Sequence, residues 1–278
     1  MGLIHMSFLS KLLGMPTDIN VVIPTYTRED STEGTIRDPY VPGMKFQTLW
    51  LLHGGGGDYA DYLKYTNIEL YAEENKVAVV MPSGYNSAYT DNPEGALYMQ
   101  YITEELPAMC RSIFPFSPAP EDNIIGGLSM GSGGAFKIAM AYPERYGMAL
   151  IMSGGGSPIT KEAAKLFDSE NYVKRLGGFR LPILKNDGQE GTVNDGWYNA
   201  KRNVDEGRPL PKLYFAIGTE DSFITGHRRC VAYCKELGYE VSSIETEGYR
   251  HEWRFWDRTL DEALSRWLPL RRSYLLPQ

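Results

Sequence analysis

Apolar runs and amphipathic stretches alternate along most of the chain. Six segments carry short runs of apolar residues that predict buried strands: KFQTLWLL, VAVVMP, NIIGGL, MALIMSG, KLYFAIG and VSSIET. Between them, apolar residues recur at helical spacing, as over residues 98–113, a predicted helix that Pro115 ends. Regular alternation of strand and helix favours a mostly parallel sheet with helices on both faces.

The remaining predicted elements lie at the two ends of the chain and around residue 66. Strand-like segments open the sequence at about residues 6–12 and 19–24, and Thr66 with Glu69 fits the capping box of a short helix. Two C-terminal helices are also expected, over Val231, Cys234 and Leu237 up to Gly238, and from about Trp253 to Trp267. Because no repeat or linker interrupts this order, we expect a single domain over residues 1–278.

One long polar segment, residues 154–208, breaks the alternation. It lies between two predicted core strands, contains a helix-like piece at 161–176, and carries the aromatic pair Trp197 and Tyr198. An insertion at that point emerges at the carboxyl ends of the strands, where a lid would sit. We therefore predict a lid-like insertion and assign Trp197 to the substrate-binding wall of an acyl pocket.

A serine surrounded by glycines follows the third apolar run. Residues 127–131 read G-L-S-M-G, the G-x-S-x-G pattern of a tight strand-to-helix corner that exposes the oxygen of Ser129 above a sheet. Gly127 and Gly131 would stand where a Cβ collides with a neighbouring strand or helix. The alternative is a glycine-rich turn whose serine only caps the helix that follows.

Further polar residues follow the other predicted strands. A serine needs a histidine to accept its proton and a carboxylate to orient that histidine, and α/β-hydrolases carry these residues in the order Ser, acid, His. Asp221 and His251 satisfy this order after Ser129. Glu220 is the alternative acid, whereas His227 lies too close in sequence to Asp221 to reach both partners.

The four glycines after His53 are interpreted as the oxyanion loop. Acyl transfer needs backbone N–H groups directed at the developing oxyanion. We assign the N–H of Met130, directly after the serine, and that of Gly55, with Gly56 as the alternative. A phosphate-binding loop is disfavoured because the glycines lack the G-K-[ST] ending. A dinucleotide-binding loop is disfavoured because the next strand does not end in an acid that could hold a ribose.

Composition narrows the function classes. The net charge is −7 with an isoelectric point near 5.3, so nucleic acid and anionic membranes are not expected as partners. No signal peptide or membrane-spanning run is found, which predicts a cytoplasmic protein. Cys110, Cys230 and Cys234 are interpreted as buried reduced thiols, and no metal or other cofactor is expected. A homo-oligomer is compatible with the sequence.

Six motifs together resemble the esterase D family of α/β-hydrolases. They are LLHGGGGD, YLKYTNIE, AVVMPSG, GGLSMGSGGAFKIAM, GTEDSF and HEWRFWDRTL, and the similarity extends over about residues 6–269. The family includes S-formylglutathione hydrolases, tributyrin esterases, feruloyl and acetyl-xylan esterases, and mycolyltransferases. The resemblance implies a triad of Ser129, Asp221 and His251 and oxyanion N–H groups at Gly55 and Met130.

The expected activity is that of a serine carboxylesterase. Its substrate would be a small-molecule ester with a short-chain acyl or aryl-acyl group, such as acetyl, butyryl or feruloyl, cleaved through an acyl-enzyme. The alternative is a thioesterase acting on S-formylglutathione, because oxygen and thiol esters pass through the same kind of tetrahedral intermediate. A catalytically inactive binding module is a third hypothesis, which the presence of all three triad residue types disfavours.

Overall fold

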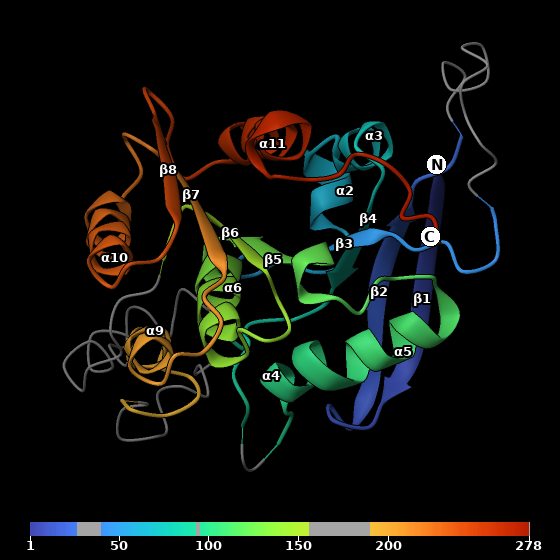
Figure 1. Cartoon of the computed structure of the whole chain (residues 1–278), viewed down its shortest axis with the longest axis horizontal. Coiled ribbons are helices and arrows are strands. Elements are labelled where there is room, and N and C mark those ends of the chain that lie inside the picture. The colour runs from blue at the N-terminus through green and yellow to red at the C-terminus, as the bar shows by residue number, and fades with distance from the viewer. Residues whose placement is uncertain (27–39, 93–94, 156–189, 278) are drawn as a thin grey trace.

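The computed structural model describes residues 1–26, 40–92, 95–155 and 190–277. Within them the chain builds an eight-stranded sheet with the order β1-β2-β4-β3-β5-β6-β7-β8 (Figure 1). The strands are β1 (Gly2–Ser10), β2 (Met15–Ile23), β3 (Gln47–Leu52), β4 (Val77–Pro82), β5 (Asn123–Leu128), β6 (Met148–Met152), β7 (Lys212–Gly218) and β8 (Val241–Thr246). Strands β3 to β8 are parallel, and β2 pairs antiparallel with both β1 and β4. The predicted mostly parallel sheet is confirmed.

Helices follow most of the strands. They are α2 (Asp61–Tyr65), α3 (Ile68–Glu74), α4 (Tyr98–Gln100), α5 (Leu106–Ile113), α6 (Met130–Ala141), α9 (Gly196–Asp205), α10 (Ile224–Glu236) and α11 (Trp253–Glu262). The helix predicted over residues 98–113 is present, with its middle turn, Tyr101–Glu105, wound as a π-helix between α4 and α5. The last predicted helix likewise ends in a π-helical turn, Ala263–Trp267.

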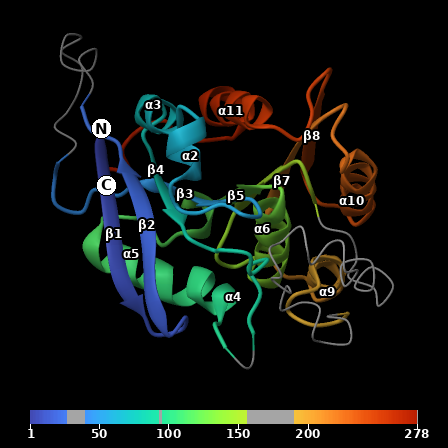
Figure 2. The ribbon, with the colours of Figure 1, turned by 180° about the vertical axis from the view of Figure 1, so that it is seen from behind.

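The helices cover both faces of the sheet, and each face has its own core. Helices α4, α5, α6, α9 and α10 pack on one face, and α2, α3 and α11 on the other (Figures 1 and 2). Alternate residues of a strand therefore enter different cores: Trp50 and Leu52 enter the first, Leu49 and Leu51 the second. Burial on both faces explains why β3 reads as a continuous apolar run.

The start of α3 differs from the predicted capping box. Asn67 is the N-cap residue and makes no side-chain capping bond. Thr66 instead donates its hydroxyl to the carbonyl of Tyr62 at 2.6 Å and accepts the Ile68 N–H at 3.2 Å. The prediction of a Thr66 and Glu69 box was wrong because the hydroxyl is used by the end of the preceding helix.

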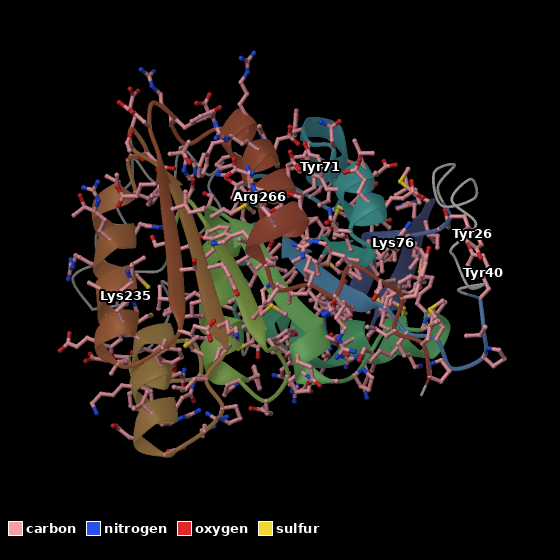
Figure 3. The ribbon with its side chains drawn as sticks, turned by 45° about the horizontal axis from the view of Figure 1, so that its top comes forward. Tyr26, Tyr40, Tyr71, Lys76, Lys235 and Arg266 are labelled. Carbon is pink, nitrogen blue, oxygen red and sulfur yellow. The ribbon has the colours of Figure 1, made fainter. Side chains whose placement is uncertain are left out.

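A polar contact between helices also fixes α3. Asp257 of α11 accepts the Asn67 N–H at 2.8 Å and the hydroxyl of Tyr71 at 3.0 Å. Figure 3 labels Tyr71 where α3 lies beside α11. The two bonds hold α3 against α11, the helix that follows the predicted catalytic histidine.

The polar insertion is described only in part. The helix expected at 161–176 lies outside the described residues. Residues 196–205 form α9, a helix that the sequence interpretation did not include, with Asp195 as N-cap accepting the N–H groups of Trp197 and Tyr198. This helix packs on α6, where Asn203 Nδ2 donates to the Met140 carbonyl at 2.8 Å.

The three cysteines are buried and free, as expected. Cys230 and Cys234 lie in the core beneath α10, which confirms their predicted packing role. None of the helices in the described ranges is long and apolar enough to cross a membrane.

Candidate active site

Ser129 occupies a strained corner between β5 and α6. Its backbone has φ 54° and ψ −117°, a conformation that non-glycine residues adopt rarely. A Cβ on Gly131 would lie 2.2 Å from the Leu52 carbonyl oxygen, and one on Gly127 would lie 2.5 Å from the backbone of Gly131. Both glycines are therefore required by close backbone approach, as predicted. Ser129 is the N-cap residue of α6 but makes no side-chain capping bond, so the alternative of a simple cap does not describe it.

The structure brings the three predicted triad side chains together. His251 Nε2 lies 2.9 Å from Ser129 Oγ, and His251 Nδ1 lies 2.9 Å from Asp221 Oδ2. Because the ionised carboxylate can only accept, Nδ1 carries the hydrogen and Nε2 is left to accept the serine proton. Ser129, Asp221 and His251 follow β5, β7 and β8, so the carboxyl ends of three parallel strands supply them.

The two alternative residues lie elsewhere. Glu220 is exposed and pairs with Arg250, with Oε2 and Nε 2.9 Å apart. His227 is buried on α10, where its Nδ1 lies 2.7 Å from the Gly154 carbonyl oxygen. Burial lowers the pKa of His227. Neither contact brings these side chains into the hydrogen-bonded chain from Asp221 to Ser129.

Asp221 has hydrogen-bond partners in addition to His251. Burial of this carboxyl group opposes ionisation, but hydrogen bonds from His251, the Phe223 N–H and the Ser153 hydroxyl outweigh it, so the pKa of Asp221 lies below its ordinary value. The Phe223 N–H donates to Oδ1 at 2.9 Å. The acid therefore stays ionised while buried, as the orientation of an imidazolium requires.

Ser153 and Trp256 extend this chain beyond the triad. Ser153 is fully buried directly after β6, with φ 54°, and its Oγ accepts Trp256 Nε1–H at 2.9 Å. The indole also stands edge-on to the His251 ring, with centroids 4.9 Å apart. Sequence reasoning missed both residues, although Ser153 follows an apolar run just as Ser129 does.

The Gly56 N–H, the alternative oxyanion donor, is hydrogen-bonded within the protein. The Gly56 N–H donates to Asn86 Oδ1 at 2.7 Å and is thereby committed to the protein. This occupancy favours Gly55 over Gly56 as the oxyanion donor. Met130 begins α6, where N–H groups of a first turn have no intrahelical acceptor and the helix dipole favours negative charge.

His53 connects the glycine loop to the loop after β4. Its Nε2 accepts the Gly84 N–H at 2.8 Å, so the hydrogen resides on Nδ1 and is donated to the Gly54 carbonyl at 2.7 Å. Burial lowers the pKa of His53, which favours the neutral ring that this arrangement needs. His53 thus fixes the loop that carries the predicted oxyanion donor Gly55.

The loop after β4 is held in an unusual backbone shape. Tyr85, Ala88 and Tyr89 all have positive φ, of 45°, 51° and 53°. Tyr89 donates its hydroxyl to the His53 carbonyl at 2.8 Å, and Lys137 of α6 donates to the Ala88 carbonyl at 2.7 Å and to Thr90 Oγ1. Burial lowers the pKa of Lys137 to about 7. The three hydrogen bonds made by Tyr89 and Lys137 hold the loop that carries Asn86.

Trp197 takes part in helix packing. Its ring stacks on Tyr233 of α10, with centroids 4.3 Å apart, and the Tyr233 hydroxyl donates to its carbonyl at 3.1 Å. The substrate-binding role assigned to Trp197 stays a prediction. In the described residues no group of three or more His, Cys, Asp or Glu side chains is arranged to hold a metal ion.

Known esterases are similar to this chain in sequence and in fold. The family described as "Putative esterase" matches residues 27–267. An acetyl esterase of Caldicellulosiruptor saccharolyticus is 29% identical over 95% of this chain and 97% of its own. Among solved structures, the fluorophosphonate-binding serine hydrolase FphF of Staphylococcus aureus is 27% identical with a TM-score of 0.78, covering 95% of this chain and 97% of its own.

A second solved structure, the S-formylglutathione hydrolase FrmB of Staphylococcus aureus, is 26% identical with a TM-score of 0.75, again covering 95% of this chain and 97% of its own. These findings confirm the resemblance drawn from the motifs and the α/β-hydrolase fold. The chain has the fold and relatives of a carboxylic ester hydrolase that uses a serine. It belongs to the esterase family whose profile it matches over residues 27–267.

Proposed function

We propose that Ser129, His251 and Asp221 form the catalytic triad of this esterase and that it hydrolyses esters of short-chain or aryl-substituted acids. The observation that carries the proposal is the continuous hydrogen-bonded chain from Asp221 through His251 to Ser129, with both contacts at 2.9 Å. Side chains from three strand ends meet in the geometry that nucleophilic acyl transfer requires. A binding module without catalysis would have no need of this arrangement.

The chemistry follows from the positions of the protons. Ser129 Oγ attacks the ester carbonyl carbon while its proton passes to His251 Nε2, and the carbonyl oxygen becomes an oxyanion that the N–H groups of Gly55 and Met130 stabilise. The intermediate then collapses, the alcohol leaves with the proton from His251, and the acyl group stays on Ser129. Water, deprotonated by His251, attacks the acyl-enzyme, and the acid is released as His251 returns the proton to Ser129 Oγ.

Two leaving groups are compatible with this triad. The relative from Caldicellulosiruptor saccharolyticus is named an acetyl esterase, which supports an oxygen ester of a short acid. The FrmB neighbour is named an S-formylglutathione hydrolase, which supports the thioester alternative. We favour the oxygen ester. The three buried free thiols support a reducing, cytoplasmic location.

The test combines labelling with turnover. The parent should react with a fluorophosphonate and hydrolyse 4-nitrophenyl acetate and butyrate, and Ser129→Ala or His251→Ala should lower kcat by about 10⁵-fold to 10⁶-fold. Asp221→Asn should cost less, about 10⁴-fold, because the carboxylate orients the imidazole without reacting. Glu220→Gln is the matched control and should leave kcat within about twofold of the parent, because exposed ion pairs contribute little.

Two outcomes would reject this assignment. Fluorophosphonate labelling that persists in Ser129→Ala would place the nucleophile elsewhere. Parent-like kcat in Asp221→Asn combined with a large loss in Glu220→Gln would exchange the acid. S-Formylglutathione is assayed beside the nitrophenyl esters, and a kcat/KM far above theirs would replace the oxygen ester by the thioester.

A further inference from the structure

Lys137 is a buried lysine of α6, the helix that Met130 begins. Burial of an amine costs free energy unless its N–H groups are hydrogen-bonded. Two acceptors come from the loop after β4: Nζ donates to the Ala88 carbonyl at 2.7 Å and to Thr90 Oγ1. A lysine amine has an N–H group for each acceptor whether it is charged or neutral, so the contact does not depend on its protonation. Lys137 therefore ties α6 to a loop that lies far from it in the sequence.

Tyr89 of the same loop packs on the same part of α6. A Cβ on Gly134 would lie 2.5 Å from the Tyr89 ring, so this glycine leaves the space that the ring fills. Gly134 precedes Lys137 by three residues, a spacing that places both on one face of the helix. Figure 2 shows this stretch of chain beside α6 on its way from β4 to α4. The Tyr89 hydroxyl donates to the His53 carbonyl at 2.8 Å, so the loop is held between α6 and the glycine loop.

Asn86 connects the loop after β4 to the proposed oxyanion donor. Its Oδ1 accepts the Gly56 N–H at 2.7 Å and would lie 3.8 Å from a Cβ on Gly55. A Cβ on Gly54 would lie 3.4 Å from the Cβ of Ser129, so the glycine loop passes directly beside the serine. Displacement of Asn86 would therefore move the Gly55 N–H relative to Ser129.

The two proposed oxyanion donors come from different parts of the chain. The Met130 N–H belongs to the first turn of α6, and the Gly55 N–H to the loop after β3. Both must lie about 2.7–3.1 Å from the position that the oxyanion will occupy. Their spacing depends on the connections between α6 and the glycine loop. One connection runs from Lys137 through the loop after β4 to Asn86 and Gly56, and we call it the Lys137 path.

We propose that Lys137 is a positioning residue for catalysis, which holds the N–H groups of Gly55 and Met130 at the spacing that the oxyanion requires. Lys137 is itself buried and acts through Asn86, without contact to the substrate. This inference rests on the proposed function, because it takes Ser129 as the nucleophile. Loss of the Lys137 hydrogen bonds should weaken stabilisation of the transition state and leave binding of the uncharged ester nearly unchanged.

The first test is Lys137→Met, which keeps most of the side-chain bulk and removes both hydrogen bonds. It should lower kcat for 4-nitrophenyl butyrate at least about tenfold, with KM within about threefold, because full removal of an oxyanion donor costs about 10²-fold to 10³-fold. Affinity for a trifluoromethyl ketone, which forms an oxyanion on Ser129, should fall in proportion to kcat/KM. Lys201→Met is the same change in an exposed ion pair with Asp205, and it should alter neither kcat nor the inhibitor affinity.

A double-mutant cycle distinguishes the Lys137 path from a general loss of stability. Asn86→Ala breaks the path at its other end and should lower kcat and inhibitor affinity in the same way. The double variant should cost little more than the worse of the two single changes, because both break one path. If Lys137→Met does not fold, Thr90→Val takes its place, removes one acceptor of the amine, and should show a smaller loss of the same kind. Losses that multiply in the double variant, or a rise in KM with unchanged kcat, would overturn the proposal.

Hydrogen exchange gives a result that does not depend on turnover. The amides of residues 54–57 should exchange faster in Lys137→Met than in the parent or in Lys201→Met, because the acceptor of the Gly56 N–H loses its support. Faster exchange there, together with a parent that hydrolyses no ester, would support the Lys137 path and reject only the proposed function. Unchanged exchange over residues 54–57 in Lys137→Met would overturn the proposal.

Discussion

Trp256 donates its indole hydrogen to Ser153 Oγ across 2.9 Å, and Ser153 in turn hydrogen-bonds to Asp221. The proposed catalytic acid is thereby tied to α11, the helix that begins two residues after His251. Trp256 also stands edge-on to the His251 ring, so one residue of α11 contacts the imidazole and, through Ser153, supports its carboxylate partner. This arrangement limits the directions in which the acid and the base can separate.

Ser153→Ala should lower kcat with little change in KM. The variant removes a hydrogen bond to a buried charged group, worth about 1.5–3 kcal/mol, so a loss of about tenfold or more in kcat is expected. KM should stay within about twofold because Ser153 contacts the acid and not the substrate. The rate of fluorophosphonate labelling should fall in the same proportion as kcat.

Ser112→Ala supplies the control for Ser153→Ala. Ser112 is an exposed serine of α5 that donates only to the Met109 carbonyl, so its removal should leave kcat unchanged. Trp256→Phe should reproduce part of the Ser153→Ala loss, because it leaves Ser153 Oγ without its donor. A rise in KM with unchanged kcat would show that Ser153 does not act through Asp221.

Lys137 should make the free energy of unfolding rise with pH above neutrality. Its pKa falls from 10.5 to about 7 on folding because the amine is buried. Between these values the unfolded chain holds a proton that the folded protein lacks, so stability increases with pH by about 1.4 kcal/mol per unit from this group. The contribution levels off below pH 7, where both states are protonated.

Comparison with Lys137→Met isolates this contribution. Urea unfolding of both proteins between pH 7.5 and 9 should show the parent gaining about 2 kcal/mol relative to the variant, since the substituted side chain does not titrate. Other titrating groups affect both proteins alike. Parallel curves over this range would mean that the amine keeps its ordinary affinity for protons in the folded state.

Gly131 and Gly133 should respond in opposite directions to replacement by alanine. A Cβ at Gly131 would meet the Leu52 carbonyl oxygen at 2.2 Å and the His53 carbonyl oxygen at 2.7 Å, both backbone atoms that cannot move aside cheaply. Gly131→Ala should therefore cost more than about 3 kcal/mol or prevent folding. At Gly133 nothing lies within 4 Å, and Gly133→Ala should stabilise α6 by about 0.5–1 kcal/mol.

Thermal unfolding of the two variants checks this contrast. The melting temperature should fall steeply in Gly131→Ala and rise slightly in Gly133→Ala. Similar shifts in both would mean that helix propensity, and not the close approach of β3, determines which glycines this helix needs.

Strand ends were the most predictable part of the molecule. Continuous apolar runs such as VAVVMP become strands because both faces of the sheet are buried, and parallel strands bring their carboxyl ends to one edge. The candidates Ser129, Asp221 and His251 were therefore found from their positions after strands, together with the G-x-S-x-G pattern and the order Ser, acid, His. The same rule pointed to Ser153, which follows MALIM and precedes Gly154 and Gly155, but it was passed over because Ile151 stands where the G-x-S-x-G pattern has its first glycine.

Other features depend on tertiary contacts that no local pattern encodes. The loop that carries Asn86 needs positive φ at Tyr85, Ala88 and Tyr89, and a sequence gives no sign of this at residues other than glycine. Helix α9 was missed because its polar surface read as an insertion, although Asp195 two residues before Trp197 was a capping signal. The Thr66 hydroxyl was assigned to a cap but serves the preceding helix.

The proposed triad residues follow three separate strands, β5, β7 and β8, which has a consequence for how activity returns during folding. Ser129 and His251 are 122 residues apart in the sequence, and parallel strands pair only after long crossover segments have been ordered. A chain that had collapsed around β3, β4 and β5 would hold the nucleophile at its corner but lack its base. Return of esterase turnover after dilution from denaturant therefore reports the docking of β8, the last strand, and should lag behind the recovery of helical circular dichroism.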